Sequence, residues 1–118
     1  MAMKILTVTT STDLRSFEVT VIYVGDYIRY AELHRIKEEL DEVQMADFVI
    51  LSGKMPSWYA LAITAEVVKR DARIVGIFRP PAKKVLVVWS QDETLPVGTW
   101  LKFSARLTEF CLSGRYPE

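Results

Sequence analysis

The most constraining feature of the sequence is an apolar run that ends in a small polar turn and leads into a helical pattern. Residues 48–51 are continuously hydrophobic, which is typical of a short strand buried on both faces of a sheet. Ser52 and Gly53 end that strand, because glycine adopts backbone angles that other residues avoid. Pro56 suits the first turn of a helix, where its missing N–H is not needed, so a helix is predicted to begin at about Pro56. The stretch therefore predicts a strand, a tight loop and a helix.

The loop Ser52-Gly53-Lys54 is a candidate anion site. A helix N-terminus offers unpaired N–H groups and the positive end of the helix dipole, and Lys54 adds a charge beside them. The alternative is that any turn from a strand into a helix needs small residues. The loop is not a nucleotide P-loop, because the second glycine and the Lys-Ser/Thr pair of that motif are absent.

Composition limits the class of protein. With 118 residues, the chain is expected to form one α/β domain, residues 1–118, with its own core. Half of the residues are hydrophobic, which excludes a disordered chain. Fifteen Lys and Arg balance fifteen Asp and Glu, so no overall field attracts the protein to long DNA or to an anionic membrane. An anionic ligand would need a local cluster of basic residues.

Cys111 is the only cysteine in the sequence, which excludes a disulfide within the chain and a cysteine-based metal site. With no signal peptide and no apolar segment of membrane length, the expected location is the cytoplasm. We interpret Met1 and Ala2 as an addition before a natural start at Met3.

The first third of the chain predicts two strands and a helix. Residues 4–9 are rich in β-branched side chains and residues 17–23 alternate apolar with polar side chains, so the two are expected to pair as a hairpin. Residues 30–43 place apolar side chains on one face of an amphipathic helix. His34, the only histidine, lies beside that face and is expected to be a surface or boundary residue rather than a catalytic one.

The helix predicted for residues 56–70 is apolar around nearly its whole circumference. Its hydrophobic side chains are Trp58, Tyr59, Leu61, Ala62, Ile63, Ala65, Val67 and Val68. In a chain of this length a sheet covers only one side of such a helix, so we expect a second subunit against the other side, across a twofold axis. The sequence therefore predicts a homodimer.

The second half of the chain completes a mixed sheet. Residues 72–78 follow a helical crossover and should run parallel to the strand at 48–51, whereas residues 85–90 follow a short loop and should be antiparallel to their predecessor. A last strand is expected to begin at Trp100 and continue to Ser104, before a C-terminal segment that caps the core or contacts a partner. The predicted fold is α/β, with a mixed sheet of five to six strands, a β-α-β crossover and helices packed on the sheet.

This topology predicts a basic cluster at one edge of the sheet. Parallel strands joined by a helix end at the same edge, so the loop at Lys54 and the loop that begins at Arg79 should emerge side by side, where open α/β sheets bind ligands. Lys83 and Lys84 follow in the second loop. The alternative for this lysine pair is a solvated hairpin tip.

Three segments carry a further pattern: Ile50-Leu51-Ser52-Gly53-Lys54 with Pro56 and Trp58, then Val75-Gly76-Ile77-Phe78-Arg79-Pro80, then Val87-Val88-Trp89-Ser90-Gln91 followed by Gly98. In these segments the chain resembles the small stand-alone CRISPR ring nucleases. Members of that family bind and degrade cyclic tetra-adenylate, the second messenger of type III CRISPR defence. The flanking segments agree with the family only in the order of their elements.

The resemblance implies a CARF or Rossmann-like fold and a dimer whose strand-loop-helix turn binds a face of the cyclic tetranucleotide, with two dimers able to sandwich one ring. A ring of four phosphates matches the symmetry of a twofold dimer with one basic cluster per subunit. The ligand-binding residues implied are Ser52, Gly53, Lys54, Pro56, Trp58, Arg79, Ser90 and Gln91.

The chain departs from this family at the positions of its metal ligands and acid–base groups. Residues 67–69 stand where the family has helix histidines, and Arg79 stands where it has an acidic residue. Pro81 replaces a basic residue, and Gln91 replaces a histidine. No metal and no other cofactor is therefore expected, and the metal-dependent route of the family is improbable here.

Three functions remain open. The first is a scavenger that binds cyclic oligoadenylate and lowers its free concentration. The second is a metal-independent ring nuclease, in which a ribose 2′-hydroxyl attacks the neighbouring phosphate and Lys54 or Arg79 stabilises the developing charge, leaving a 2′,3′-cyclic phosphate. The third is a structural or regulatory subunit that binds no nucleotide.

Overall fold

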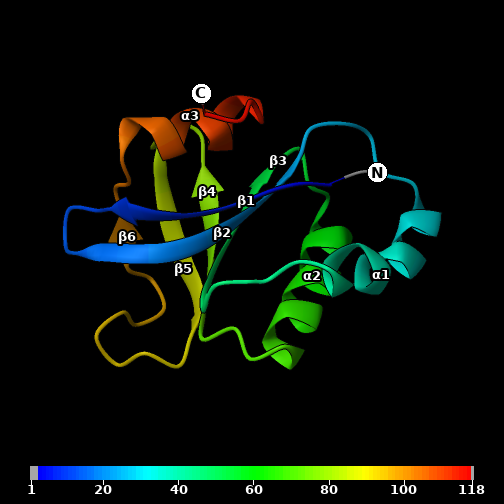
Figure 1. The fold of residues 1–118 in the computed structure, drawn as a ribbon, viewed down its shortest axis with the longest axis horizontal. Coiled ribbons are helices and arrows are strands. Elements are labelled where there is room, and N and C mark those ends of the chain that lie inside the picture. Colours follow the sequence, from blue (N-terminus) through cyan, green and yellow to red (C-terminus); the bar gives the residue numbers. More distant parts are fainter. Residues whose placement is uncertain (1–2, 118) are drawn as a thin grey trace.

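The computed structural model describes residues 3–117, which form a six-stranded mixed sheet with helices packed on it (Figure 1). The strands are β1 (Met3–Ser11), β2 (Ser16–Val24), β3 (Phe48–Gly53), β4 (Ile74–Arg79), β5 (Lys84–Ser90) and β6 (Trp100–Leu101). The helices are the 3-10 helix η1 (Tyr30–Arg35), α1 (Ile36–Asp41), α2 (Ser57–Lys69) and α3 (Ala105–Ser113). The predicted α/β fold class is confirmed. Our interpretation of Met1 and Ala2 concerns residues outside the described part.

The strands lie in the sheet in the order in which they occur in the chain. β1 and β2 form the predicted antiparallel hairpin, β3 and β4 are parallel, and β5 is antiparallel to β4, as expected. β2 is also parallel to β3, because η1 and α1 form a second helical crossover between them. Three adjacent strands, β2 to β4, therefore end at the same edge of the sheet.

Side chains that alternate along the strands build a core on each face of the sheet. Val21 and Phe48 face the core that α3 covers, whereas Ile22, Val49 and Leu51 face the core under α1 and α2. Figure 1 shows α3 on one side of the sheet and the α1–α2 pair on the other. The two faces explain why residues 48–51 are continuously hydrophobic.

The sheet curves until its first and last parts meet. Thr12, at the tip of the first hairpin, forms an isolated bridge with Phe103, which follows β6. The N–H of Asp13 donates to the carbonyl oxygen of Lys102 at 3.2 Å. This closure places Phe103 in the core with α3 and shortens the last strand, which was expected to continue to Ser104 but ends at Leu101. Ser104 instead caps α3, because its hydroxyl accepts the N–H of Leu107.

The helix expected over residues 30–43 is two shorter pieces. Its first part winds as η1, with three residues per turn, and only the following six residues are α-helical. Ile36 and Leu40 are buried as their spacing predicted, but Leu33 on the 3-10 segment is exposed. His34 is also exposed, as expected.

α2 buries one face and leaves another uncovered. Tyr59, Ile63 and Val67 are buried against the sheet and α1, but Leu61 on the opposite face is 70% exposed. The dimer that this apolar circumference predicts is not tested by a single chain and stays a prediction. None of the helices within residues 3–117 is long and apolar enough to cross a membrane.

Candidate functional site

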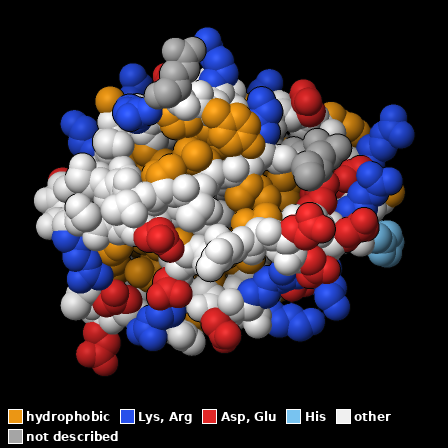
Figure 2. Space-filling model, in the orientation of Figure 1, with side chains coloured by type: hydrophobic (Ala, Val, Ile, Leu, Met, Phe, Trp, Pro, Cys, Tyr) orange, Lys and Arg blue, Asp and Glu red, His pale blue; other side chains and the backbone are white. Residues whose placement is uncertain are grey.

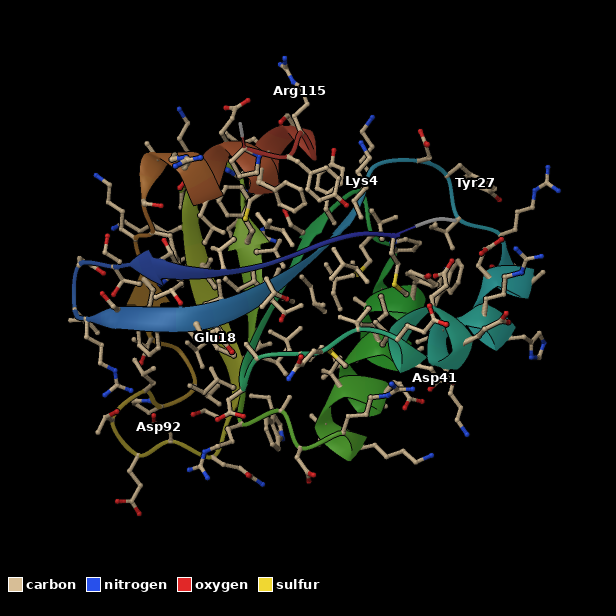
Figure 3. The ribbon with its side chains drawn as sticks, in the orientation of Figure 1. Lys4, Glu18, Tyr27, Asp41, Asp92 and Arg115 are labelled. Atoms are coloured by element: carbon tan, nitrogen blue, oxygen red, sulfur yellow. The ribbon has the colours of Figure 1, made fainter. Side chains whose placement is uncertain are left out.

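A groove of about 790 Å³ opens where β2 and β3 end, at the carboxyl edge of the parallel strands. One wall is the loop after β2 and the start of η1, which contribute Asp26, Tyr27 and Tyr30. The other wall is the turn from β3 into α2. Figure 3 shows Tyr27 on the first of these walls. Ligands of open α/β sheets bind in crevices at this edge, so the groove is the candidate functional site.

The turn from β3 into α2 is held tightly against β2. Gly53 has a φ of +94°, and the N–H of Lys54 donates to the carbonyl oxygen of Val24 at 2.6 Å. A side chain at Gly53 would overlap that same carbonyl group. The close approach fixes the backbone of the turn, while the side chain of Lys54 remains exposed at the groove.

The N-terminus of α2 opens into the same groove. Pro56 occupies the N-cap position with extended backbone angles, and Pro56 and Trp58 both line the groove. The helix has no side-chain cap and no acidic residue in its first turn. Its first N–H groups and the positive end of its dipole are therefore available to an anion, next to Lys54.

Aromatic rings form the rest of the groove surface. Tyr27 is 88% exposed and Tyr30 is 72% exposed, which is unusual for such large side chains. The rings of Tyr30 and Trp58 contact each other across the two walls, with their centroids 4.6 Å apart and their planes at 41°. Exposed rings beside a cation provide stacking surfaces for the bases of a nucleotide.

Four of the residues implied by the resemblance come together here: Gly53, Lys54, Pro56 and Trp58 all line the groove. Ser52 lies just beneath it and is buried, and its hydroxyl donates to the carbonyl oxygen of Cys111 at 2.5 Å. Burial also raises the pKa of the Cys111 thiol to about 12, while the nearby Ser52 hydroxyl acts in the opposite direction. Ser52 therefore joins β3 to α3 in this structure.

Ser90 and Gln91 lie at the opposite edge of the sheet. Ser90 pairs with Ile74, the first residue of β4, because β5 runs antiparallel to β4. The hydroxyl of Ser90 accepts the N–H of Asp92 at 3.0 Å and so stabilises the turn after β5. The expectation that Ser90 would lie near the Ser52-Gly53-Lys54 loop is wrong. Because β5 runs antiparallel to β4, its last residue, Ser90, lies at the opposite edge of the sheet.

Arg79 ends β4 at the same edge as the groove, and its carbonyl oxygen accepts the N–H of Lys83 in the turn into β5. Lys83 and Lys84 border a narrow crevice beside α3, separate from the groove that Lys54 lines. Figure 2 shows Lys and Arg side chains along the upper rim, over α3. The predicted basic residues share an edge, but they are not gathered in one cavity.

Sequence reasoning missed the loop after β2. Asp26, Tyr27 and Tyr30 belong to the groove only because β2 lies parallel to β3 and ends beside it. The sequence did contain a signal for this pairing. The helix predicted over residues 30–43 links β2 to β3, and two strands joined by a helical crossover should be parallel.

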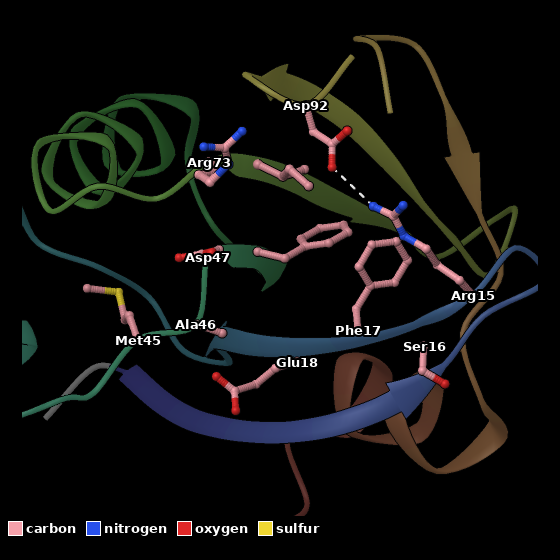
Figure 4. Close-up of a pocket in the computed structure, with 11 residues that line it drawn as sticks. Arg15, Ser16, Phe17, Glu18, Met45, Ala46, Asp47, Arg73 and Asp92 are labelled. Atoms are coloured by element: carbon pink, nitrogen blue, oxygen red, sulfur yellow. Dashed lines mark hydrogen bonds and ion pairs between the residues drawn. The ribbon is translucent and has the colours of Figure 1, made fainter. Parts of the chain in front are cut away.

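A second hollow, of about 400 Å³, lies at the amino edge of the parallel strands (Figure 4). Arg15 there forms an ion pair with Asp92 at 3.0 Å and covers the ring of Phe17. Bonds to Thr94, together with Arg15, hold the pKa of the Asp92 carboxyl below its usual value. Because its charges are mixed and partly paired with each other, this hollow is a poorer anion site than the groove.

Residues 22–102 match the family model described as CRISPR-associated protein (Cas_csx3). The chain belongs to this CRISPR-associated family. The matched region of the Cas_csx3 family runs from β2 to β6 and includes both walls of the groove. No curated protein is similar enough to the chain to count as a match.

Proposed function

We propose that the protein binds cyclic oligoadenylate, with cyclic tetra-adenylate as the best candidate, and lowers the free concentration of this messenger in type III CRISPR signalling. The observation that carries the proposal is a single groove that combines Lys54, the uncapped N-terminus of α2 and three aromatic rings. The proposal places the protein in the cytoplasm, together with its ligand.

The groove supports this ligand because it offers both kinds of contact that a nucleotide needs. Lys54 and the first N–H groups of α2 provide positive charge and donors for a phosphate. Tyr27 and Tyr30 offer faces on which a base stacks, at about 1–3 kcal/mol per base. A phosphate-only ligand would leave these exposed rings unused.

A homodimer is the second part of the proposal. Beside the exposed face of α2, the sheet presents a row of apolar side chains, Ile77, Leu86 and Trp100, on neighbouring strands. Trp100 is 45% exposed, and Ile77 and Leu86 are half-buried. A second copy packed on this surface would cover both the row and Leu61, and two grooves related by a twofold axis would suit a cyclic ligand.

The alternative function is a metal-independent ring nuclease, and Asp26 is the observation that favours it. Asp26 lines the groove on the wall opposite Lys54. Asp26 could accept the proton of a ribose 2′-hydroxyl as that oxygen attacks the adjacent phosphorus, while Lys54 balances the charge that develops on the phosphate. The bond from phosphorus to the 5′-oxygen then breaks, the 5′-oxygen takes a proton from solvent, and the product is linear with a 2′,3′-cyclic phosphate and a 5′-hydroxyl.

A single-turnover incubation with radiolabelled cyclic tetra-adenylate tests both functions, with the protein in excess and EDTA present. A native gel reports binding and a denaturing gel reports cleavage. We expect a shifted band with intact ligand, and we expect Lys54→Glu to abolish it. Lys69→Glu is the matched control, because Lys69 is an exposed lysine at the far end of α2.

The remaining outcomes separate the alternatives. Linear product that Asp26→Asn abolishes would establish the nuclease in place of the scavenger. No shift with the wild-type protein, or equal loss in Lys54→Glu and Lys69→Glu, would contradict binding in the groove and leave the structural or regulatory role.

A further inference from the structure

Three oxygen atoms are buried without a hydrogen-bond partner where η1 and α1 pack on α2. They are Glu32 Oε2 on η1, Glu39 Oε2 on α1 and Tyr59 Oη on α2, and they are the buried side-chain atoms so identified within residues 3–117. Tyr59 is fully buried. Unpaired buried polar groups are costly, so three of them in one interface call for a physical explanation.

The two carboxylates lie on consecutive helical segments beside Tyr59. Glu39 is three residues after Ile36 on α1, next to the face that Ile36 and Leu40 bury, and Glu32 is on η1, which leads into α1. Burial raises the pKa of Tyr59 to about 12, and the charges of Glu39 and Glu32 add to that increase. Both carboxylates therefore act on the phenol oxygen.

The arginine at the interface between these helices is paired with other carboxylates. Within the described residues, the ion pairs that reach this interface are those of Arg70, which binds Glu66 at 2.8 Å and Asp41 at 2.6 Å. Glu32 and Glu39 receive no such partner. Figure 2 shows acidic side chains gathered over α1. One further cation would balance the charge between α1 and α2.

One of the two glutamates also borders solvent. Glu39 lines an open hollow of about 470 Å³, together with Arg35, Glu38 and Glu42. Three carboxylates outweigh the charge of Arg35 in this hollow, so a cation attracted to it would reach Glu39 from solvent.

We propose that Glu32, Glu39 and the Tyr59 hydroxyl bind a hard divalent cation, Ca²⁺, Mg²⁺ or Mn²⁺, as a structural ion between η1–α1 and α2. Carboxylate and hydroxyl oxygens are ligands that such ions prefer, and water completes their coordination. No three His, Cys, Asp or Glu side chains within residues 3–117 form a metal-binding group, and here the phenol oxygen supplies the third protein ligand. All three oxygens are buried without a hydrogen-bond partner, which is the condition expected of oxygens that share an ion.

The ion would also stabilise the groove. η1 carries Tyr30 and Glu32, while α2 carries Trp58 and Tyr59, so an ion at this interface holds the two ring-bearing walls together. This inference does not depend on which nucleotide the groove binds.

Thermal unfolding of the wild-type protein tests the site, in EDTA and then in Ca²⁺, Mg²⁺ or Mn²⁺ at constant ionic strength. We expect at least one ion to raise the Tm by about 5 °C at tenfold excess over its Kd. Glu39→Gln removes a buried charge, so it should raise the Tm in EDTA and abolish the increase with the ion. Glu38→Gln is the matched control on the same helix and in the same hollow, and it should keep the ion-dependent increase.

Terbium luminescence provides a second measurement, because Tb³⁺ replaces Ca²⁺ and is sensitised by a nearby aromatic ring. We expect emission from the wild-type protein that Ca²⁺ displaces, and loss of that emission in Tyr59→Phe and Glu32→Gln. No increase in Tm with any of the ions, or an equal loss in Glu38→Gln and Glu39→Gln, would overturn the proposal, since the second result indicates diffuse counter-ion binding.

Discussion

Gly53 is the residue on which the shape of the groove most depends. Its φ of +94° disfavours any L side chain, and a Cβ atom would also overlap the carbonyl group of Val24. Both effects force the turn away from β2 and would break the hydrogen bond from the N–H of Lys54 to Val24.

We expect Gly53→Ala to lower the free energy of unfolding by about 3 kcal/mol, measured in urea. Gly98→Ala is the matched control, because Gly98 has a φ of +97° but open space around its Cβ position. Gly98→Ala introduces the backbone strain without the clash, so it should lower the free energy of unfolding by about 1 kcal/mol. Equal losses in the two variants would show that the contact with Val24 does not matter.

Cys111 is expected to be chemically inert in the folded protein. Burial raises the pKa of its thiol to about 12, so almost no thiolate is present at neutral pH. We expect a thiol-specific disulfide reagent to label Cys111 only at the rate of unfolding, and at once in guanidinium chloride. Rapid labelling without denaturant would contradict the packing of α3 on β3.

The same thiol makes stability depend on pH. Because the folded pKa lies above the ordinary value of 9, the unfolded state loses its proton first as pH rises. The contribution of the thiol to stability is fully present below about pH 9 and is lost as pH rises toward 12. In Cys111→Ala the decrease in stability over this window should be smaller.

Arg70 connects two elements, since it follows α2 but binds residues of α1. Its guanidinium donates to Glu66 at 2.8 Å, to Asp41 at 2.6 Å and to the carbonyl oxygen of Lys37 at 3.0 Å. The bond to Glu66, and to a lesser extent that to Asp41, raises the pKa of Arg70. This network holds the end of α1 on α2.

We expect Arg70→Ala to cost about 1–2 kcal/mol of unfolding free energy. A double-mutant cycle with Asp41→Ala should give a coupling below about 1 kcal/mol, because Asp41 is more than half exposed. Arg73→Ala is the control, since within residues 3–117 the guanidinium of Arg73 makes only a long hydrogen bond of 3.5 Å, to the carbonyl oxygen of Gln91. A cost in Arg73→Ala as large as in Arg70→Ala would contradict a specific role for the α1–α2 network.

The arrangement of the whole chain leaves apolar side chains exposed on α2 and on the neighbouring face of the sheet. Leu61 on α2 is 70% exposed, and Trp100 on β6 lies on the same face of the sheet as Leu86. Exposed apolar surface of this kind marks sites of association in soluble proteins. The proposed twofold dimer would bury it.

We expect the wild-type protein to be a dimer and Leu61→Glu to be a monomer, measured by size-exclusion chromatography with light scattering. Leu112→Glu is the matched control, because Leu112 is also an exposed leucine, at 40%, but lies on α3, which covers the opposite face of the sheet. A wild-type monomer, or dissociation in Leu112→Glu alone, would contradict the proposed interface.

Local sequence patterns were sufficient to predict most elements and part of the groove. The apolar run at 48–51, the glycine after it and Pro56 each act through the backbone of their own neighbours, and the structure has β3, a positive φ at Gly53 and a helix one residue after Pro56. The parallel crossover from β3 to β4 follows from chain connectivity.

Contacts between distant residues decided the rest, because no local pattern reports which segments meet. The curvature that joins Thr12 to Phe103 shortened the last strand, and the pairing of β2 with β3 brought Tyr27 and Tyr30 to the groove. The direction of β5 placed Ser90 at the far edge. Residue types and their order thus predict a strand, a turn and a helix N-terminus, whereas the composition of the site around them depends on packing across the sheet.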